Sequence, residues 1–282
     1  MQKRQLGSTG REVAVIGQGT WFIEEGEPSA TIAALRRGLD LGMTHIDTAE
    51  LYGSGEAEAR VGEAIAGRRD EVFLVSKVLP NHASRSGVIA SCEASLARLG
   101  TDRLDCYLLH WRGAYPLHET LAGFEALQRE GKILSWGVSN FDVADLEEVR
   151  RIAGGGHPAC NQVLYHLQER AIENAVLPWC ERHRVAVVGY SPFGHKGSLP
   201  GHRTSRGRVL TEVAATHGAT VRQVVLAFLV RKAPLLTIPK ASNPDHTAEN
   251  AGAGDLQLSE DETARIDQAF PLDRAERALP ML

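Results

Sequence analysis

Hydrophobic positions along the chain follow one rhythm from end to end. Short runs rich in β-branched residues recur, and each is followed by a longer segment with an apolar stripe and a charged face. This alternation is typical of parallel strands joined by helices. Strands are predicted at Val13–Ile16, Thr44–Asp47, Val72–Val75, Leu104–Leu109, Ile133–Val138, Ala159–Val163, Val185–Tyr190 and Leu235–Ile238. Eight such strands are the number that closes an α/β barrel.

The segments between these runs have the period of amphipathic helices. Several begin at a proline and end at a glycine, which is the usual asymmetry of helix ends. Asn243-Pro244, for example, suits an N-cap followed by the first helical residue. Prolines open helices at Pro28, Pro116 and Pro244, and glycines close them at Gly42, Gly100 and Gly131. Helices are predicted over Ser29–Leu41, Ser86–Leu99, Leu117–Arg129, Val143–Ile152, Val209–Thr216 and Val221–Val230.

The length of the chain and its lack of linkers agree with one barrel. Its 282 residues suit a single (β/α)8 TIM barrel, and no Pro/Ser-rich linker divides them. We therefore predict one α/β domain over residues 1–282, with a short N-terminal β-hairpin. An open doubly wound sheet would show the same alternation, but Gly17-Gln18-Gly19 lacks the third glycine and the helix of a dinucleotide fingerprint. The stretch 193–207 is predicted as a long functional loop.

Composition and charge exclude several classes of partner. A formal net charge of −4, with charges of both signs interspersed, offers no basic surface for nucleic acid or an anionic membrane. No segment has the ~18 uncharged apolar residues of a membrane span, and the N-terminus lacks the apolar region of a signal peptide. The cysteines form no C-x-x-C pair and are expected to be structural; they are Cys92, Cys106, Cys160 and Cys180. These features are typical of a reduced, cytoplasmic protein.

Ionisable side chains stand at the ends of three neighbouring predicted strands. Asp47 ends the second strand and Tyr52 follows it shortly afterwards. Lys77 follows the third strand, and His110 follows the fourth. Taken one by one, these residues also suit a helix cap, an ordinary tyrosine, a solvated lysine and a core histidine. Their coincidence at successive strand ends favours a catalytic site, because catalytic groups of such barrels project from the C-terminal ends of strands.

This set of residues suits the reduction of a carbonyl group, which needs a hydride donor and an acid for the developing alkoxide. A free tyrosine has a pKa of about 10, and a neighbouring ammonium is expected to lower that pKa. We assign Tyr52 as the proton donor, Lys77 as its electrostatic partner and Asp47 as the anchor of the lysine. His110 would orient the carbonyl oxygen. No metal-ligand spacing accompanies these residues, so no metal is expected.

Seven sequence blocks resemble the signature blocks of aldo-keto reductases and occur in the same order. They are Asp47–Gly53, Lys77, Leu108–Trp111, Gly137–Phe141, Asn161–Gln162, Gly189–Pro192 and Ile238–Lys240. The resemblance runs from about Leu6 to the end of the chain. It implies the (β/α)8 barrel, a small carbonyl compound as substrate, and NADPH/NADP+ as cofactor, with NADH as an alternative. The cofactor would lie extended across the C-terminal face of the barrel.

The resemblance also implies a set of cofactor contacts. Ser139, Asn140 and Gln162 would bind the nicotinamide carboxamide, although Ser139-Asn140 also suits a cap of the helix that follows. Asn161 would support Gln162, and Tyr190 would stack on the nicotinamide ring. Further contacts are expected at Gly19, Thr20, Ser191, Lys240, Ser242, His246, Glu249 and Asn250, and weaker phosphate candidates are Lys196 and Arg203.

The segment after Lys240 departs from the pattern of NADP-specific relatives. These relatives carry an arginine on the ribose 2′-phosphate where this chain has His246, and Ala241 stands in place of a serine, with Ser242 beside it. A histidine is mostly neutral at pH 7 and cannot make the two-pronged contact of an arginine. The helix N-terminus nearby still favours an anion. NADP is therefore expected in preference to NAD, and dual use is left open.

Aromatic residues are predicted to line the substrate pocket. Trp21 and Trp111 would form its walls, and Phe22 and Tyr115 would extend them, although Trp21 also suits a plug of the barrel. The segment after Phe270 is short, so we expect an open pocket and broad acceptance of aldehydes. Separately, a monomer is expected in preference to an oligomer.

Two other functions fit the same fold. One is a catalytically slow NADP(H)-binding sensor or regulatory subunit, against which the Asp47/Tyr52/Lys77/His110 set argues. The other is a phosphate-binding isomerase, which would need a glutamate base at a strand end; none is well placed.

Overall fold

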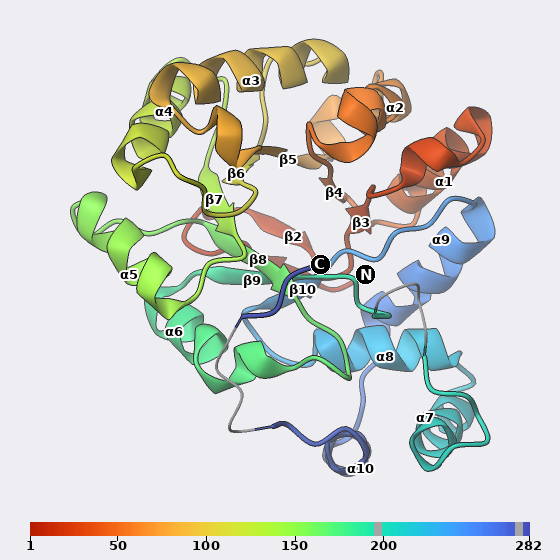
Figure 1. The fold of residues 1–282 in the computed structure, drawn as a ribbon. Helices are drawn as coiled ribbons and strands as arrows, with labels where there is room; N and C mark the ends of the chain where they lie inside the picture. Colours follow the sequence, from red (N-terminus) through yellow and green to blue (C-terminus); the bar gives the residue numbers. More distant parts are fainter. Residues whose placement is uncertain (195–198, 274–278) are drawn as a thin grey trace.

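Eight parallel strands curl into a barrel in the computed structural model, which describes residues 1–194, 199–273 and 279–282 (Figure 1). Each strand is hydrogen-bonded to the next along the chain, and the register is parallel throughout. This is the predicted (β/α)8 architecture, and the prediction is confirmed. The strands, in order around the barrel, are β3 (Gln18–Gly19), β4 (His45–Asp47), β5 (Phe73–Val78), β6 (Cys106–Leu109), β7 (Trp136–Ser139), β8 (Cys160–Leu164), β9 (Ala186–Tyr190) and β10 (Leu235–Thr237).

Contacts between the last strand and the first close the barrel. Parallel bridges join Ile16 to Thr237 and Gly19 to Lys240. Gly19 is required at this seam, because a Cβ atom there would lie 2.5 Å from the carbonyl oxygen of Ile238. The backbones therefore approach as closely as only glycine permits.

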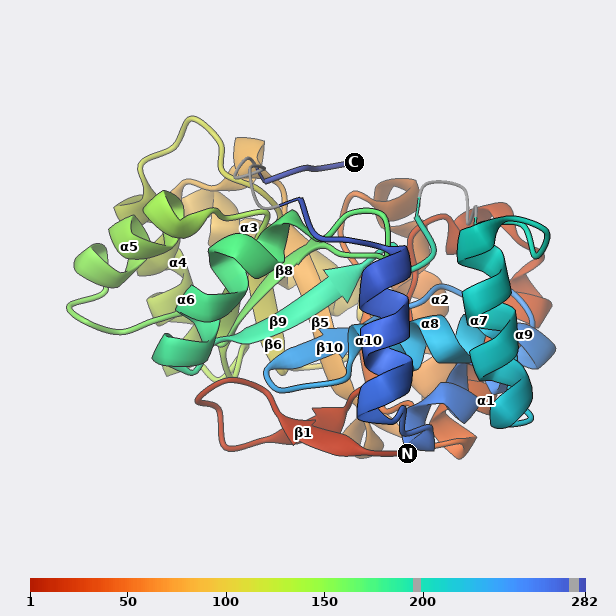
Figure 2. The same cartoon turned by 90° about the horizontal axis from the view of Figure 1, so that it is seen from below.

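A two-stranded antiparallel hairpin, predicted at the N-terminus, covers the floor of the barrel (Figure 2). It consists of β1 (Lys3–Gln5) and β2 (Glu12–Ala14). The prediction that residues 13–16 form the first barrel strand is wrong. Val13 pairs with Arg4 in the hairpin and packs, with Leu6, into the interior of the barrel. The true first strand is the two-residue β3, whose Gln-Gly sequence has no apolar pattern.

Helices surround the strands and connect them in the expected way (Figure 1). Each strand from β3 to β8 is followed by one helix, while α7 is inserted before the helix that follows β9, and α10 follows the last barrel helix. The helices are α1 (Pro28–Asp40), α2 (Glu56–Ile65), α3 (Arg85–Leu99), α4 (Leu117–Arg129), α5 (Val143–Ile152), α6 (Val176–His183), α7 (Ser205–Thr216), α8 (Val221–Leu229), α9 (Pro244–Ala251) and α10 (Glu260–Ala269).

The buried apolar residues form two layers on either side of the strands. The larger layer lies between strands and helices and contains residues such as Leu35, Phe124 and Trp179. The smaller one fills the barrel interior and consists of Leu6, Val13, Phe73, Val75, Cys106, Leu108, Ala159, Cys160, Ala186, Val188, Leu236 and Ile238. All four cysteines are free and buried, and two of them belong to this interior layer. Asp47 and Lys77 lie at the C-terminal ends of β4 and β5, beyond this interior layer. The apolar interior therefore separates the polar site from the N-terminal hairpin.

Candidate functional site

Asp47, Lys77 and Tyr52 meet at the C-terminal end of the barrel. Asp47 is the last residue of β4, Lys77 lies in β5, and Tyr52 begins the 3-10 turn Tyr52–Gly55 that follows β4. The Lys77 ammonium donates to Asp47 Oδ1, to the carbonyl oxygen of Thr48 at 2.9 Å and to the Tyr52 hydroxyl at 3.1 Å. Exposed fractions are 1% for Asp47, 0% for Lys77 and 9% for Tyr52. The strand ends therefore bring the three side chains together, as the sequence predicts.

Burial changes the expected acidity of this set. Desolvation raises the pKa of Tyr52 and outweighs Lys77, which lowers it. The expectation that Lys77 brings the tyrosine pKa below its ordinary value is therefore not met in the structure. Burial lowers the pKa of Lys77, but Asp47 and Tyr52 together raise this pKa by more than burial lowers it. The pKa of Lys77 therefore lies above its ordinary value. At neutral pH the tyrosine is protonated and the lysine is charged.

His110 follows β6 and lies against Tyr52, with ring centroids 5.7 Å apart and nearly perpendicular planes. Desolvation, aided by the Lys77 charge, lowers the pKa of His110 to about 2. The imidazole is therefore neutral and carries one N–H. Its Nδ1 atom is buried and has no hydrogen-bond partner among the described residues. A neutral histidine of this kind can donate one hydrogen bond to a ligand oxygen.

Amide and hydroxyl groups from β7 and β8 adjoin this set. Ser139 Oγ donates to the carbonyl oxygen of Gln162 at 2.9 Å, and the backbone N–H of Asn140 donates to the same oxygen at 2.8 Å. The Gln162 side chain reaches Asp47, because its Nε2 donates to Asp47 Oδ2 at 2.7 Å. This contact was not predicted from the sequence. It places the predicted nicotinamide side of the site next to the acid set.

Asn140 connects β7 to His110 and to β9. Its Nδ2 donates to the backbone carbonyl of His110 at 3.2 Å, and its Oδ1 accepts from the Tyr190 hydroxyl at 2.9 Å. The left-handed backbone of Asn140, with φ of 60°, suits asparagine better than most residues. The helix cap that was the alternative interpretation of Ser139-Asn140 is instead Asp142, which accepts from the Asp145 N–H.

Asn161 and Thr20 hold neighbouring backbone in place. Asn161 Nδ2 donates to the carbonyl oxygen of Phe141 at 2.8 Å, so it supports the turn after β7 and not Gln162 directly. Thr20, predicted as a cofactor contact, is fully buried, and its hydroxyl donates to the Asp47 carbonyl at 2.9 Å. Its predicted contact would have to come from the backbone.

The predicted phosphate-side residues lie around the start of α9. Asn243 caps this helix by accepting from the His246 N–H at 2.9 Å, and Pro244 is its first residue, as predicted. His246 is exposed, and its Nδ1 lies 3.3 Å from Asn243 Nδ2. Lys240 precedes the helix; burial lowers its pKa, while Glu25 and Glu24 raise it. Ser242 and Glu249 are partly exposed, and Asn250 is buried.

The loop after β9 is only partly described. Ser191 follows Tyr190 with a left-handed φ of 51°. Lys196 lies outside the described residues. Arg203 is exposed just before α7, where Thr204 caps the helix by accepting from the Gly207 N–H. The helix predicted over Val209–Thr216 therefore begins earlier, at Ser205, inside the predicted loop 193–207.

Aromatic side chains form one wall of the site. Trp21 stacks on Phe22 with ring centroids 4.6 Å apart and lies 6.4 Å from Tyr52. Trp111 lies 4.9 Å from His110. Both tryptophans therefore adjoin the acid set, where the sequence analysis placed them.

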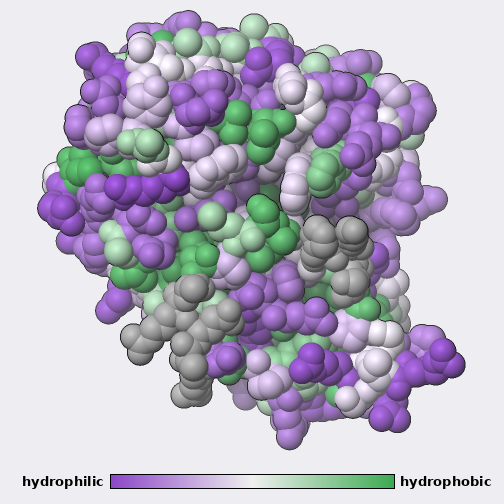
Figure 3. All heavy atoms as spheres, viewed as in Figure 1, coloured by the Kyte–Doolittle hydropathy of each residue, from purple (hydrophilic) through white to green (hydrophobic). Residues whose placement is uncertain are grey.

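Several separate patches of apolar residues lie among polar residues on the face seen along the barrel axis (Figure 3). Among the described residues, seven large hydrophobic side chains are exposed. Three of them lie in the segments that follow β3, β4 and β6, and two are the last residues of the chain. Leu51, at 42% exposed, was missed because it follows the Asp-Thr-Ala-Glu motif and has no periodicity of its own. We call the five residues the apolar rim; they are Phe22, Leu51, Tyr115, Met281 and Leu282.

The last residues of the chain return to the barrel mouth (Figures 1 and 2). Leu279 packs against the outer apolar layer, and the backbone of Leu282 is hydrogen-bonded to the Tyr190 hydroxyl. The short C-terminal segment therefore reaches Tyr190, and the open pocket stays a prediction. A short segment suffices because α10 ends close to the same face.

A family model for the aldo/keto reductase family matches residues 15–270. The chain belongs to this family. It is 44% identical to methylglyoxal reductase YeaE of Escherichia coli over the full length of both chains, and 32% identical to glyoxal reductase of Bacillus subtilis over 96% of this chain and 93% of that one. A solved aldo/keto reductase of Klebsiella pneumoniae, in complex with NADP and acetate, superposes with a TM-score of 0.94 at 44% identity and covers all of both chains.

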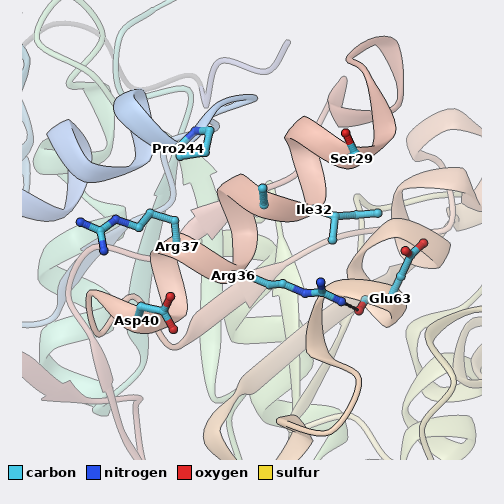
Figure 4. Close-up of a pocket in the computed structure, with 8 residues that line it drawn as sticks. Ser29, Ile32, Arg36, Arg37, Asp40, Glu63 and Pro244 are labelled. Atoms are coloured by element: carbon cyan, nitrogen blue, oxygen red, sulfur yellow. Dashed lines mark hydrogen bonds between the residues drawn. The ribbon is translucent and has the colours of Figure 1, made fainter.

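This aldo/keto reductase also has a groove on the flank of the barrel, away from the acid set (Figure 4). Its volume is about 450 Å³, and it lies between α1, α2 and the start of α9. Arg36 crosses it to donate to the Glu63 carbonyl at 2.8 Å. None of Asp47, Tyr52, Lys77 or His110 lines it; the lining residues are Ser29, Ile32, Ala33, Arg36, Arg37, Asp40, Glu63 and Pro244.

The described part of this aldo/keto reductase offers neither a metal site of acidic, histidine or cysteine ligands nor a membrane-spanning helix. No group of three or more His, Cys, Asp or Glu residues there could hold a metal ion. No helix there is both long and apolar enough to cross a membrane.

Proposed function

We propose that this chain reduces aldehydes and dicarbonyl compounds to alcohols with NADPH. Tyr52 acts as the general acid, assisted by Lys77, Asp47 and His110. The observation that carries the proposal is the Lys77 ammonium, which contacts both the Tyr52 hydroxyl and Asp47 in a buried site. An alcohol dehydrogenase (NADP+)-like reaction of EC class 1.1.1 follows from this assignment.

The protonation states suit reduction. Because burial raises the pKa of Tyr52, the phenol keeps its proton at neutral pH until a stronger base develops beside it. An alkoxide is such a base, and the Lys77 charge stabilises the phenolate that remains. Because its pKa is low, His110 is neutral and has one N–H. It can donate this N–H to the carbonyl oxygen of the substrate and so orient the carbonyl group.

The residues present fit a nicotinamide nucleotide. The amides of Asn140 and Gln162 and the hydroxyl of Ser139 are linked by hydrogen bonds to one another or to Asp47, and their groups match the donors and acceptors of a carboxamide. The capped N-terminus of α9, with Lys240 before it, suits a phosphate group. When bound, NADPH supplies the hydride. Two solved relatives, at 44% identity, contain NADP or NADPH.

The apolar rim indicates which carbonyl compounds fit best. Trp21 and Trp111 flank the acid set, and the rim extends this apolar surface outward. Two relatives are named methylglyoxal and glyoxal reductases. We therefore propose that 2-oxoaldehydes are substrates and that an apolar substituent, as in phenylglyoxal, raises kcat/KM above that for methylglyoxal.

The test is NADPH oxidation by wild type and Tyr52→Phe over a panel of aldehydes and dicarbonyls. Loss of the general acid should lower kcat by about 100-fold or more, while NADPH still quenches tryptophan fluorescence. Tyr115→Phe is the matched control, because it removes an exposed hydroxyl outside the acid set and should retain activity.

Each result points to one function. Full activity of Tyr52→Phe would remove Tyr52 from the mechanism. A wild-type protein that binds NADPH but reduces nothing in the panel would favour the sensor or regulatory subunit. We also propose that the protein is a single-domain monomer, which sedimentation equilibrium tests. A cytoplasmic location is proposed as well; the free, buried cysteines support it, and cell fractionation tests it.

A further inference from the structure

Gln162 connects two sides of the barrel that are not neighbours in the sheet. It lies in β8, is 2% exposed, and reaches Asp47 at the end of β4, with 2.7 Å between Nε2 and Oδ2. The side of the amide that faces Asp47 must be the NH2 group, because an amide oxygen would repel a carboxylate. The direction of this hydrogen bond is therefore fixed by chemistry.

The bond makes Gln162 the first member of a buried chain of contacts. Asp47 uses one oxygen for Gln162 and the other for Lys77, and Lys77 in turn donates to the Tyr52 hydroxyl. All four side chains are buried. The orientation of the Asp47 carboxylate, and through it that of Lys77, depends on both partners of the carboxylate.

The opposite side of Gln162 faces the residues predicted to hold the nicotinamide. Its backbone carbonyl accepts from Ser139 Oγ and from the Asn140 N–H. Because Nε2 is engaged with Asp47, Oε1 is the side-chain atom that remains to accept from a carboxamide NH2. An amide that accepts at its oxygen donates more strongly at its nitrogen, because linked hydrogen bonds polarise one another.

We propose that Gln162 is a positioning residue that couples occupancy of the nicotinamide site to the orientation of Asp47 and Lys77 behind Tyr52. The proposal rests on the proposed function for its effect on catalysis. Coupling of this kind is reciprocal between the two equilibria: a bound nucleotide favours one orientation of Asp47, and that orientation favours nucleotide binding to the same extent. Loss of the contact between Gln162 and Asp47 should therefore weaken nucleotide binding. It should also lower kcat for a separate reason, because Lys77 is then held less firmly behind Tyr52.

Charged and titratable groups face both Asp47 and Tyr52. His45 of β4 and Cys160 of β8 interact electrostatically with Asp47. Lys77 of β5, Asp47 of β4 and Glu24 of the turn before α1 act on Tyr52 electrostatically. His110 lies against its ring, and Tyr190 interacts with it from the end of β9. All of these remain in a Gln162 variant, so the ratio of variant to wild type at each pH isolates the change at Gln162.

The decisive variant is Gln162→Glu, compared with wild type between pH 5 and 8.5 under one ionic strength. Below the pKa of the introduced carboxyl, its proton can donate to Asp47 as the amide does. Above that pKa, two carboxylates face each other. We expect kcat and NADPH affinity, each relative to wild type, to fall together by about tenfold or more as the pH rises, since a buried hydrogen bond to a charged group is lost.

Two comparison variants separate coupling from simple contact. Ser139→Ala removes a predicted carboxamide contact that does not touch Asp47, so its loss of NADPH affinity relative to wild type should be the same at every pH. Gln162→Met cannot ionise, and its loss of kcat should also be independent of pH. Gln162→Met also replaces Gln162→Glu as the test if the glutamate variant does not fold. The coupling predicts that Gln162→Met lowers kcat and NADPH affinity together. Loss of NADPH affinity alone would overturn the coupling.

Fluorescence titration with NADPH, run beside the kinetics, keeps the two proposals distinguishable. If wild type reduces no carbonyl compound, the proposed function is overturned, while the pH-dependent NADPH affinity of Gln162→Glu still supports the coupling. If the variant-to-wild-type ratios of Gln162→Glu stay constant with pH, Gln162 is only a local contact and the coupling is overturned.

Discussion

Lys77 is the residue on which the site is centred. Its three ammonium hydrogens are directed at three acceptors, on Asp47, Thr48 and Tyr52, and no part of the side chain is exposed. A buried ammonium needs such partners, because an unpaired charge at this depth would cost several kcal/mol. The same contacts that keep the lysine charged also hold the phenol in one position. Stability and acid catalysis thus depend on one set of hydrogen bonds.

A prediction at the same scale concerns His246. Because an imidazole lacks the planar, two-pronged set of donors that an arginine offers to a phosphate, we expect His246→Arg to raise the NADPH/NADH ratio of kcat/KM about tenfold. The assay is steady-state kinetics with both nucleotides at one pH and one salt concentration. Asp245→Asn serves as a control for a general change of charge at the same helix turn. An unchanged ratio would place the 2′-phosphate elsewhere.

At the scale of elements, the sequence predicted most helices to within a few residues, and the misses have physical causes. Residues 117–129 and 143–152 form helices with the predicted bounds. α6 was missed because Pro178 interrupts its pattern, although a proline in the first turn leaves no hydrogen bond unmade. α10 was missed because Ile266 is its one fully buried residue among polar neighbours. These two helices are fixed by tertiary packing, which periodicity does not reveal. α2 was also missed, although six of its residues are buried, because two of the six, Glu58 and Arg60, are charged and interrupt the apolar stripe.

One loop that shapes the substrate side is fastened by charge. Arg112, next to Trp111, donates to Asp145 at 2.9 Å and to both oxygens of Glu148, and so ties the segment after β6 to α5. These groups are partly exposed, so the pair contributes about 1 kcal/mol at most after screening.

We therefore expect Arg112→Met to raise KM for phenylglyoxal about three- to fivefold, with NADPH affinity unchanged. Saturation kinetics and fluorescence titration measure the two quantities. Arg129→Met, at the far end of α4, is the control for the loss of one positive charge. A parallel loss of NADPH affinity would show that the segment after β6 also shapes the nucleotide site.

At the scale of the molecule, residues at strand ends were predictable and contacts across the barrel were not. Asp47, Lys77 and His110 could be placed together because parallel strands end at one face. The bond from Gln162 to Asp47 and the return of Leu282 to Tyr190 depend on how distant segments meet, so no local pattern encodes them. The raised pKa of Tyr52 was likewise missed, since the depth of burial is a property of the assembled barrel.

The last helix is attached to the barrel by a buried ionic network, which makes stability depend on pH. Glu173 accepts from Arg170, from Arg231 of the segment after α8 and from the Tyr165 hydroxyl. Arg170 also donates to the carbonyl oxygen of Phe270, just after α10. Although burial raises the pKa of Glu173, the arginines and Tyr165 lower it more, to about 2.

A carboxyl whose pKa is depressed in the folded state stabilises the protein above its unfolded pKa and loses that effect as the pH falls toward its folded value. We expect Glu173→Gln to lower the free energy of unfolding by about 3 kcal/mol at pH 7, because two buried guanidinium groups lose their anion. The difference from wild type should shrink as the pH falls from about 4.5 to about 2. Urea unfolding at several pH values measures this difference.

The control is Glu181→Gln, which breaks an exposed pair with Lys232 and should lower the free energy of unfolding by less than about 1 kcal/mol. Equal losses of stability in the two variants would show that the network does not hold α10 in place.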